Sequence, residues 1–502
     1  MNSEESTQAG MSAGVQAPRK QHWAQMVVLA ALYAAPALVC THLAVVEDPD
    51  VWWHLSTAQW ILQHNAVPQT DPFSVYGAGK PWVAYSWLYE LLILQLYKGL
   101  GLTGLVAYTA AMVMAITAAL HRLNRRLQQD FTLALLLTFA GSFCLISLWT
   151  PRSWLLSILF FVLELDILMQ ARRTGKTREL YWLPVILALW ANVHILFVFG
   201  LLIVGMALAE AVFAHWFKSI QARIGFGRLC ILMVACVLAT LLNPYGPSLY
   251  RVAYDFSSQH GAMSVVSELK SIPFRGLQDY GILLFTLAAA AVLGRAQKLL
   301  LFELMLVAFA VMVSFRSLRD EWVVLVVASA IIASGLKGDM ENRFVLRAWA
   351  ALPVVAAAGL IAFLGFGFQG VNNRFLSAQL KKRMPVDAVA FVKEKGYPGP
   401  VFDDYTWGGY LISNLGLPVV IDSRQNVFGD RRMMRSIATW GGAKDWASDP
   451  DLKSAGVIIG PANAPLSQLL RMCPGFDLAY EDSFVAVFVP RADQAAATHG
   501  NK

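Results

Sequence analysis

The chain has 502 residues, of which 57% are hydrophobic and only 15% are charged, and its mean hydropathy is +0.51. Its apolar runs repeatedly approach the roughly 20 residues that span a bilayer, which excludes an ordinary soluble protein and predicts a polytopic membrane protein. The net charge of +7 does not indicate nucleic-acid binding, because Lys and Arg fall in short loops between the apolar runs.

The N-terminal segment precedes the first apolar run. Residues 1–22 are small and polar and predict a disordered tail on the cytoplasmic side. The following run, residues 23–46, has a basic flank like that of a signal peptide. Bulky Val39 before Cys40 fits no cleavage site, and the run continues past both, so an uncleaved membrane span is expected.

About eleven spans are expected within residues 23–370, which form a predicted transmembrane domain. They are residues 24–46, 103–120, 131–149, 154–170, 180–194, 196–217, 229–243, 280–294, 299–315, 321–336 and 348–368. With a cytoplasmic N-terminus, an odd number of spans places the C-terminal tail on the outer side. Residues 180–217 could instead form one long kinked helix, which would reverse the orientation of every later span.

Two long loops are expected on the outer side. The first, residues 47–102, contains two helix-like segments, residues 51–63 and 82–98, that are expected to lie along the membrane. The second segment is apolar but is interrupted by Glu90, which argues against a span. The second loop, residues 243–280, is polar and long enough to fold over a site.

From residue 371 the composition changes to that of a soluble domain. Helix-like and strand-like segments alternate as in a small α/β domain. Residues 386–394 and 410–415 are helix-like, and residues 399–402, 418–421, 456–459 and 484–489 are strand-like. The expected fold class is therefore a polytopic α-helical membrane protein with a C-terminal extracytoplasmic α/β domain, residues 371–490. Residues 491–502 are expected to be disordered.

The stretch EDPDVWWHL, which begins at Glu47, carries the clearest sign of chemistry. Asp48 and Asp50 are expected just outside the hydrocarbon core of the membrane. Charged side chains near lipid are energetically costly and are usually functional. Asp50 could serve only as an N-cap of the helix that follows. A single cap needs one carboxylate and this site has more, so we predict that Asp50 and Asp48 are catalytic and deprotonate a hydroxyl acceptor. Trp53 and His54 are predicted to contact substrate, although Trp53 could belong to an aromatic belt and His54 could merely cap.

Other polar residues at span ends fall on the same side as Asp50 in this topology. They are Arg152, Asn192, His194, Asn243, Tyr245, Arg316, Arg319, Asp320 and Glu321. The three arginines suit a donor phosphate, but Arg152 and Arg316 could be flank charges and Arg319 could form an ion pair with Asp320. The other candidates for substrate contact could instead satisfy helix ends and turns. Their convergence predicts one site at the outer face.

Two motifs of the tail are further candidates. DDYTWGGYL contains Tyr405 and Trp407 and ends a strand where it opens a helix, so its free amides could receive a polar head group. The alternative is a tight turn that needs glycine. Asp422 and Arg424 follow the next strand-like segment and would lie at the same edge of a parallel sheet, where ligands usually bind.

The first outer loop, EDPDVWWHLSTAQWILQHNAVPQTDPFSVYGAGKPW, resembles that of the GT-C superfamily, membrane glycosyltransferases that use polyprenyl-phosphate sugars. The chain is most similar to a bacterial subgroup with a DPDxWWHL opening and a tail containing DYxWGGYL and IDxR, here residues 404–411 and 421–424. The resemblance implies inverting transfer of a sugar from a polyprenyl-phosphate donor to a glycan, lipid or protein acceptor at the outer face of a bacterial inner membrane. It implies Asp50 or Asp48 as the base. A donor phosphate held by arginines needs no nucleotide, and the sequence leaves open whether a divalent metal or no cofactor is used.

Two other classes of function compete with this prediction. A transporter or flippase of lipid-linked saccharide usually needs ionisable groups within its spans. Glu164, Asp166, Glu210 and Glu303 are the candidates, and they show no internal symmetry. A non-catalytic scaffold of a polysaccharide assembly would tolerate the loss of Asp50.

Overall fold

The computed structural model describes residues 19–39, 41–217, 222–258, 266–297, 299–339 and 348–491. Most of the two tails that were expected to be disordered, residues 1–18 and 492–502, lies outside these ranges. Residues 19–22, which were assigned to the N-terminal tail, instead form the first turn of helix α1. Their sequence, RKQH, contains no Gly or Pro that would stop the helix short of them.

A bundle of long helices forms the larger part of the molecule, and each expected span falls on one of them. They are α1 (Arg19–Leu38) with α2 (Thr41–Glu47), α5 (Leu102–Leu127), α6 (Phe131–Cys144), α7 (Trp154–Thr174), α8 (Leu183–Val193), α9 (Phe197–Trp216), α10 (Phe226–Thr240), α13 (Leu277–Gly294), α14 (Leu301–Arg316), α15 (Trp322–Gly335) and α16 (Ala348–Phe368). The single kinked helix considered for residues 180–217 is wrong. The backbone leaves the helix at His194 (φ −163°, ψ 148°), so α8 and α9 are separate helices.

Six stretches among the described residues are helical, long and apolar enough to cross a membrane. They are His22–Glu47, Leu102–Leu127, Trp154–Thr174, Phe197–Trp216, Leu277–Gly294 and Ala350–Phe368. The chain is therefore a multi-pass membrane protein. Helix α15 is shorter and apolar on every side, and it lies buried in the bundle against α5, α6, α13 and α14. The number of crossings and their direction stay predictions.

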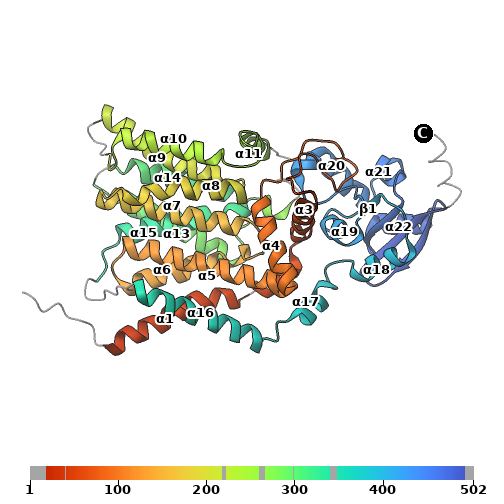
Figure 1. The fold of residues 1–502 in the computed structure, drawn as a ribbon, viewed down its shortest axis with the longest axis horizontal. Helices are drawn as coiled ribbons and strands as arrows, with labels where there is room; N and C mark the ends of the chain where they lie inside the picture. Colours follow the sequence, from red (N-terminus) through yellow and green to blue (C-terminus); the bar gives the residue numbers. More distant parts are fainter. Residues whose placement is uncertain are drawn as a thin grey trace, which may run out of the picture.

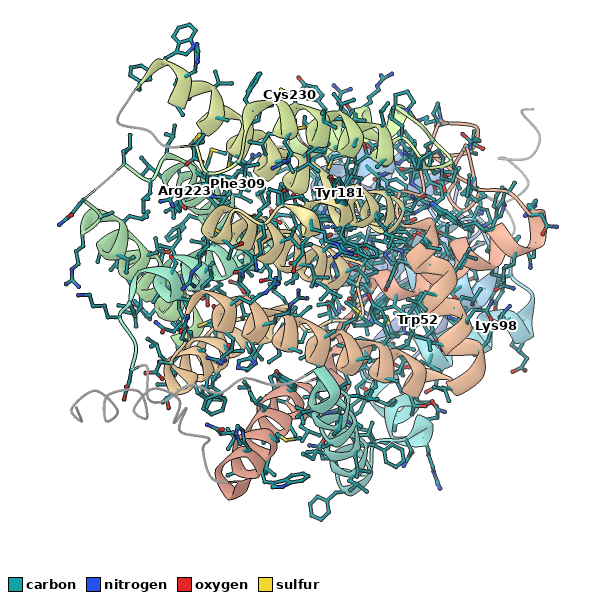
Figure 2. The ribbon with its side chains drawn as sticks, turned by 60° about the vertical axis from the view of Figure 1, so that its left-hand side comes forward. Trp52, Lys98, Tyr181, Arg223, Cys230 and Phe309 are labelled. Carbon is teal, nitrogen blue, oxygen red and sulfur yellow. The ribbon has the colours of Figure 1, made fainter. Side chains whose placement is uncertain are left out.

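Figure 1 shows the bundle helices running roughly side by side, with the C-terminal domain at one end of the bundle, here called the tail end. Helices α3 (Asp50–His64) and α4 (Trp87–Leu100) run across this end, between the bundle and the domain. In Figure 2, Trp52 and Lys98 accordingly lie at the tail end, whereas Arg223 lies toward the opposite end. Residues 51–58 of α3 are all buried, because α4 covers the helix on one side and the C-terminal domain on another.

The connections between bundle helices contain short helical segments. They are η1 (Ile146–Leu148), η2 (Arg178–Trp182), α11 (Ser248–Ser258), η3 (Ser267–Leu269) and η4 (Leu318–Asp320), of which all but α11 are 3₁₀ helices. The connections before α7, α9 and α13 and after α14 all lie at the tail end. This follows when consecutive bundle helices run in opposite directions. The predicted convergence of polar span ends on one side is therefore reproduced in the fold.

The C-terminal domain contains a four-stranded sheet with the order β1-β2-β4-β3. The strands are β1 (Val401–Asp403), β2 (Val457–Pro461), β3 (Phe476–Glu481) and β4 (Val485–Pro490). Strand β1 is parallel to β2, with Val401 opposite Val457, and the other pairs are antiparallel. Around the sheet lie α17 (Asn373–Leu380), α18 (Val386–Lys395), α19 (Gly408–Leu415), α20 (Gln425–Trp440), η5 (Trp446–Ser448), α21 (Pro450–Lys453) and α22 (Pro465–Met472).

The strand predicted at residues 418–421 is not a full strand. Only Val419 pairs, through isolated parallel bridges to Val401 and to Ser74 of the first loop. Pro418 has no amide hydrogen to donate, which limits the pairing. The N–H of Val75 donates to the carbonyl of Val419 (3.0 Å), and the N–H of Val419 donates to the carbonyl of Phe73 (3.2 Å). The first loop thus extends the sheet of the C-terminal domain.

The two glycines of the WGG motif allow close approaches between backbones. A Cβ atom added at Gly409 would lie 2.9 Å from the carbonyl oxygen of Pro49 and 3.3 Å from the nitrogen of Trp53. One added at Gly408 would lie 2.2 Å from the carbonyl oxygen of Ile421. Neither glycine has a positive φ. The glycines are therefore needed for contact between α19, α3 and the strand region, and not for a special turn.

We expect Gly409→Ala to loosen the contact between α19 and α3 and to destabilise the protein by about 1–3 kcal/mol, the usual cost of overpacking. The measurement is the thermal unfolding midpoint in detergent, together with the rate of proteolysis between the bundle and the C-terminal domain. Gly359→Ala is the matched control, because an added Cβ there meets no atom within 4 Å. Equal midpoints and equal cleavage for the Gly409 variant and the wild type would contradict the prediction.

Candidate active site

A cavity of about 290 Å³ lies where the first loop, the tail end of the bundle and the C-terminal domain meet. The predicted residues that line it are Asp50, Trp53, His54, Arg152, His194, Arg319, Tyr405 and Arg424. They come from α3, the connections next to α7, α9 and α14, and the two tail motifs. Residues from six separate parts of the sequence therefore share one polar cavity.

Arg152 joins three carboxylates at one wall of this cavity. Its Nε lies 2.6 Å from Oδ2 of Asp48, and its Nη1 lies 2.9 Å from Oδ2 of Asp50 and 3.0 Å from Oε1 of Glu268. The guanidinium also stacks on the ring of Trp154, 4.5 Å from its centroid. Nε and Nη1 of Arg152 are therefore occupied by carboxylates, which makes Arg152 a poorer phosphate ligand than the sequence predicted.

Asp48 and Asp50 have different surroundings. The side chain of Asp48 is 0% exposed, and its Oδ1 accepts the backbone N–H of Asp50 (2.9 Å). The side chain of Asp50 is 18% exposed and faces the cavity. Burial raises the pKa of Asp48 to about 6, with Arg152 opposing the rise and the charge of Asp50 adding to it. The arrangement leaves Asp50 accessible and encloses Asp48 behind it.

The possibility that Asp50 caps helix α3 is wrong. The N-cap position is Pro49, and Asp50 is the first residue of the helix. The Asp48 side chain instead accepts the N–H of Asp50. Pro49 itself has no side chain that could cap, which explains why the capping carboxylate lies one residue earlier.

Arg319 is the second arginine of the cavity. Its guanidinium stacks on the rings of Trp154 and Phe256, 5.3 Å from each centroid. Within the described ranges it forms no ion pair with a carboxylate, so the predicted pair with Asp320 is not formed. Asp320 lies half-buried next to it, and desolvation raises the pKa of Asp320 to about 6, with Arg319 opposing the rise. Arg319 is therefore the cationic side chain of the cavity that an anionic ligand can reach without displacing a carboxylate.

Two histidines also line the cavity, and Nδ1 of each ring contacts another buried side chain. Nδ1 of His54 lies 3.1 Å from Oε1 of Glu90, and Nδ1 of His194 lies 2.8 Å from Oγ of Ser157. Both rings are buried except toward the cavity. His54 was considered as a helix cap, but its side chain instead contacts Glu90 of α4.

Arg424 belongs to a buried ion cluster that connects the C-terminal domain to the first loop. Its Nη1 lies 2.7 Å from Oδ1 of Asp71, and its Nη2 lies 2.6 Å from Oδ2 of Asp422. The guanidinium stacks 4.7 Å from the centroid of Trp82. Asp422 is fully buried and does not line the cavity, so its carboxylate neutralises Arg424. Asp422 and Arg424 lie at the same edge, as expected, but Arg424 is neutralised by Asp422 and Asp71 and not by a ligand.

Several other predicted site residues have structural contacts away from the cavity. The hydroxyl of Tyr245 accepts the N–H of Ala84 and donates to the carbonyl of Pro68, which ties the second loop to the first. The side chains of Asn192, Asn243 and Trp407 bond to the indole of Trp87, to the NPYG turn itself, and to the carbonyl of Arg383, respectively. Arg316 and Asp320 also lie outside the lining. These positions match the alternatives in which span ends and turns are satisfied locally.

Sequence reasoning missed several lining residues. They are Tyr85, Ser153, Trp154, Phe256, Val266, Glu268, Thr406, Ser423, Gln425 and Asn426. Most of them are chain neighbours of predicted residues, and this proximity was a usable signal. Glu268 had no such signal, because its role depends on how the second loop folds back onto Arg152. That loop was expected to fold over a site, and Phe256, Val266 and Glu268 show that it does.

Across the part of the chain that the structure describes, no group of three or more His, Cys, Asp and Glu side chains is arranged to hold a metal ion. The carboxylates next to the cavity are grouped around Arg152 instead.

Comparison with known proteins adds evidence on the fold. No protein-family model matches the sequence, and no curated protein matches it. The crystal structure of the Archaeoglobus fulgidus oligosaccharyltransferase tethered with an acceptor peptide containing the NVT sequon is similar, with a TM-score of 0.57 and 13% identity over 88% of this chain and 69% of that chain. The crystal structure of ArnT from Cupriavidus metallidurans bound to undecaprenyl phosphate has a TM-score of 0.50 and 12% identity over 95% of this chain and 99% of that chain. The chain has a GT-C-like fold.

This likeness confirms the fold class that was predicted from the sequence. The GT-C-like bundle carries a C-terminal α/β domain, as expected. At 12 to 13% identity the likeness concerns the fold alone. The bacterial subgroup and the assignment of each site residue stay predictions.

The raised pKa of Asp48 predicts a pH-dependent difference in stability between the wild type and Asp48→Asn. A carboxyl whose folded pKa is raised favours the folded state below about pH 4, and this contribution is lost as pH rises through about 6. The wild type should therefore lose up to about 3 kcal/mol relative to the variant between pH 4 and 7. Unfolding midpoints measured in detergent at several pH values provide the check, and a constant difference between the two proteins would contradict it.

Proposed function

We propose that the protein is a glycosyltransferase that moves a sugar from a polyprenyl-phosphate donor to a hydroxyl or amide acceptor. The observation that carries the proposal is the pairing, in one cavity, of an accessible carboxylate, Asp50, with an arginine that has no carboxylate partner among the described residues, Arg319. Inverting transfer needs a base for the acceptor and a cation for the departing phosphate. The GT-C-like fold supports the same reaction class.

Asp50 is the proposed base. Its side chain reaches the cavity, whereas both oxygens of Asp48 are occupied by Arg152 and by the N–H of Asp50. The acceptor oxygen or nitrogen attacks the anomeric carbon, its proton passes to the Asp50 carboxylate, and the bond from that carbon to the phosphate oxygen breaks. Arg152 and Asp48 keep Asp50 in place, and polyprenyl phosphate leaves with the bonding electron pair.

Arg319 is the proposed ligand of the donor phosphate, and an apolar groove in the bundle suits the prenyl chain. The groove has a volume of about 550 Å³ and is lined by side chains of α9, α10, α11 and α14, from Val198 to Ala209 along α9. These eleven steps correspond to about 16 Å of helix. Helix α11 joins the two sites, since Tyr250 lines the groove and Phe256 lines the cavity. The ArnT neighbour bound to undecaprenyl phosphate supports a donor of this class.

The acceptor is proposed to enter from the C-terminal domain. That side of the cavity presents hydroxyl and amide groups of Tyr405, Thr406, Ser423, Gln425 and Asn426. Such groups bind sugars and peptides through hydrogen bonds. The oligosaccharyltransferase neighbour was crystallised with a tethered acceptor peptide, which supports transfer to an acceptor, and we propose a glycan, a lipid or a protein as its class.

We propose a bacterial inner membrane as the location, with the cavity and the C-terminal domain on the outer side. The transporter alternative is less well supported by the ionisable groups of the bundle. Asp166 forms ion pairs with Arg122 and Arg126, and Arg172 pairs with Glu210 and Glu303. These pairs lie at the bundle end opposite to the cavity, where they hold helices together. A substrate path through the bundle gains no support from them.

The test is sugar transfer in proteoliposomes from radiolabelled polyprenyl-phosphate sugars to an extract of candidate acceptors. We expect Asp50→Asn to lower the transfer rate by about 100-fold or more, because the base is lost. Asp48→Asn should lose less, since its single amide oxygen can still accept one of the two hydrogen bonds that Asp48 accepts, from the N–H of Asp50 or from Arg152.

Asp387→Asn is the matched control for this test, because it removes an exposed carboxylate that pairs with Lys381 of the C-terminal domain. Transfer by Asp50→Asn at the wild-type rate would reject Asp50 as the base. Failure of the wild-type protein to consume any polyprenyl-phosphate sugar would reject the proposed function as a whole.

A further inference from the structure

Glu90 is a fully buried carboxyl group that the proposed reaction does not use. It lies on α4, its Oε1 contacts Nδ1 of His54 (3.1 Å), and its Oε2 has no hydrogen-bond partner among the described residues. His54 lies one helical turn after Asp50 on the same face of α3, so the two side chains line the cavity together. A carboxyl group behind a histidine that faces a cavity normally fixes the position of the hydrogen on the imidazole.

Burial determines which partner carries the hydrogen in this pair. It raises the pKa of Glu90 well above its ordinary value, with Arg424 opposing the rise. It lowers the pKa of His54 well below its ordinary value, and the charges of Arg152, Arg424 and Arg319 lower it further. Both shifts favour the uncharged form of the pair. An acid hydrogen on Oε2 would be a buried donor without an acceptor among the described residues, so the hydrogen is placed on Oε1, where it is donated to Nδ1. The ring hydrogen of His54 then lies on Nε2.

His194 has the same arrangement with a different partner. Oγ of Ser157 accepts the indole N–H of Trp190 (2.8 Å) and lies 2.8 Å from Nδ1 of His194. In the described part of the chain, the hydroxyl hydrogen of Ser157 has no other acceptor, so it is donated to Nδ1. The ring hydrogen of His194 then also lies on Nε2. Neither Nε2 has a hydrogen-bond partner among the described residues, and both rings line the cavity.

We infer that His54 and His194 present Nε2–H donors, fixed by Glu90 and Ser157, which bind the phosphate of the lipid donor together with Arg319. The inference rests on the proposed function and adds two phosphate ligands and two positioning residues to it. Arg319 lines the same cavity as both imidazoles. Two neutral donors and one cation can satisfy several phosphate oxygens without adding positive charge beside the base Asp50.

The alternative function for His54 is that of a proton acceptor. In that case Glu90 would be an ionised carboxylate that accepts the Nδ1–H, and the lone pair of Nε2 would face the cavity. The two possibilities make opposite predictions for Glu90→Gln. A glutamine side chain can donate N–H to Nδ1, as the neutral acid does, but it cannot replace a carboxylate charge.

The experiment compares binding of undecaprenyl phosphate and of undecaprenol, which lacks the phosphate, to the full-length protein in nanodiscs. We expect Glu90→Ala to weaken binding of undecaprenyl phosphate by about tenfold, because one phosphate donor loses its orientation, and Glu90→Gln to stay within about threefold of wild type. Ser157→Ala should weaken binding of undecaprenyl phosphate by a similar factor. Binding of undecaprenol should be the same in all of these proteins.

Glu164→Gln is the matched control, because Glu164 is a fully buried glutamate that does not line the cavity and whose oxygens have no partner in the described part of the chain. The inference is overturned if Glu90→Ala binds undecaprenyl phosphate like the wild type, if Glu90→Gln is as weak as Glu90→Ala, or if undecaprenol binding falls in parallel.

Sugar transfer separates failure of this inference from failure of the proposed function. In transfer assays, Glu90→Ala should raise the KM for the donor more than it lowers kcat. If Glu90→Ala transfers sugar with the kinetics of the wild type, the inference is contradicted and the proposed function is not. Phosphate-dependent binding that is weakened in Glu90→Ala, without any transfer by the wild type, would remove the function and leave the inference.

Discussion

The guanidinium of Arg152 connects parts of the chain that are far apart in sequence. It contacts Asp48 and Asp50 beside the start of α3 and Glu268 in the second loop, while its own backbone lies two residues before α7. A buried arginine is costly unless its hydrogen bonds are satisfied, so the first loop, the second loop and the bundle must come together for the charge to be tolerated. The position of Asp50 depends on this one side chain.

A second ion cluster connects the C-terminal domain to the first loop in a similar way. Arg424 pairs with Asp422 of its own motif and with Asp71 of the first loop, and all three are buried. Removing one partner from such a cluster typically costs about 3–5 kcal/mol. The cluster, the backbone bonds at Val419 and the close contact at Gly409 make the first loop and the C-terminal domain one structural unit. The cavity between them is therefore a fixed feature of the fold.

The sequence predicted the architecture well, because long apolar runs and loop charges report membrane helices directly. It also predicted that Arg152, His194 and Arg319 share one side with Asp50, which follows from counting spans. It did not predict which charges neutralise one another. Asp422 and Arg424 were both expected at a ligand site, yet their mutual pairing depends on Asp71, about 350 residues earlier in the chain. Such pairs are set by tertiary contacts that no local pattern contains.

The distinction between Asp48 and Asp50 shows the same limit. Both carboxylates lie in one short motif, and only the fold shows that Asp48 is enclosed while Asp50 faces the cavity. Glu90 gave a different signal. It was noted as an interruption of an apolar helix, and its contact with His54 explains why a carboxyl group is present there. Isolated polar residues in apolar helices are therefore informative even where their partner is unknown.

The central claim is that this cavity holds the phosphate of a lipid-linked sugar donor. A cryo-electron microscopy structure of the protein in nanodiscs with undecaprenyl phosphate tests it most directly. The account predicts phosphate density within hydrogen-bond distance of Arg319 and of Nε2 of His54 and His194, with the prenyl chain in the groove beside Val198 and Met233. Phosphate density elsewhere, or bound lipid that leaves both the cavity and the groove empty, would contradict it.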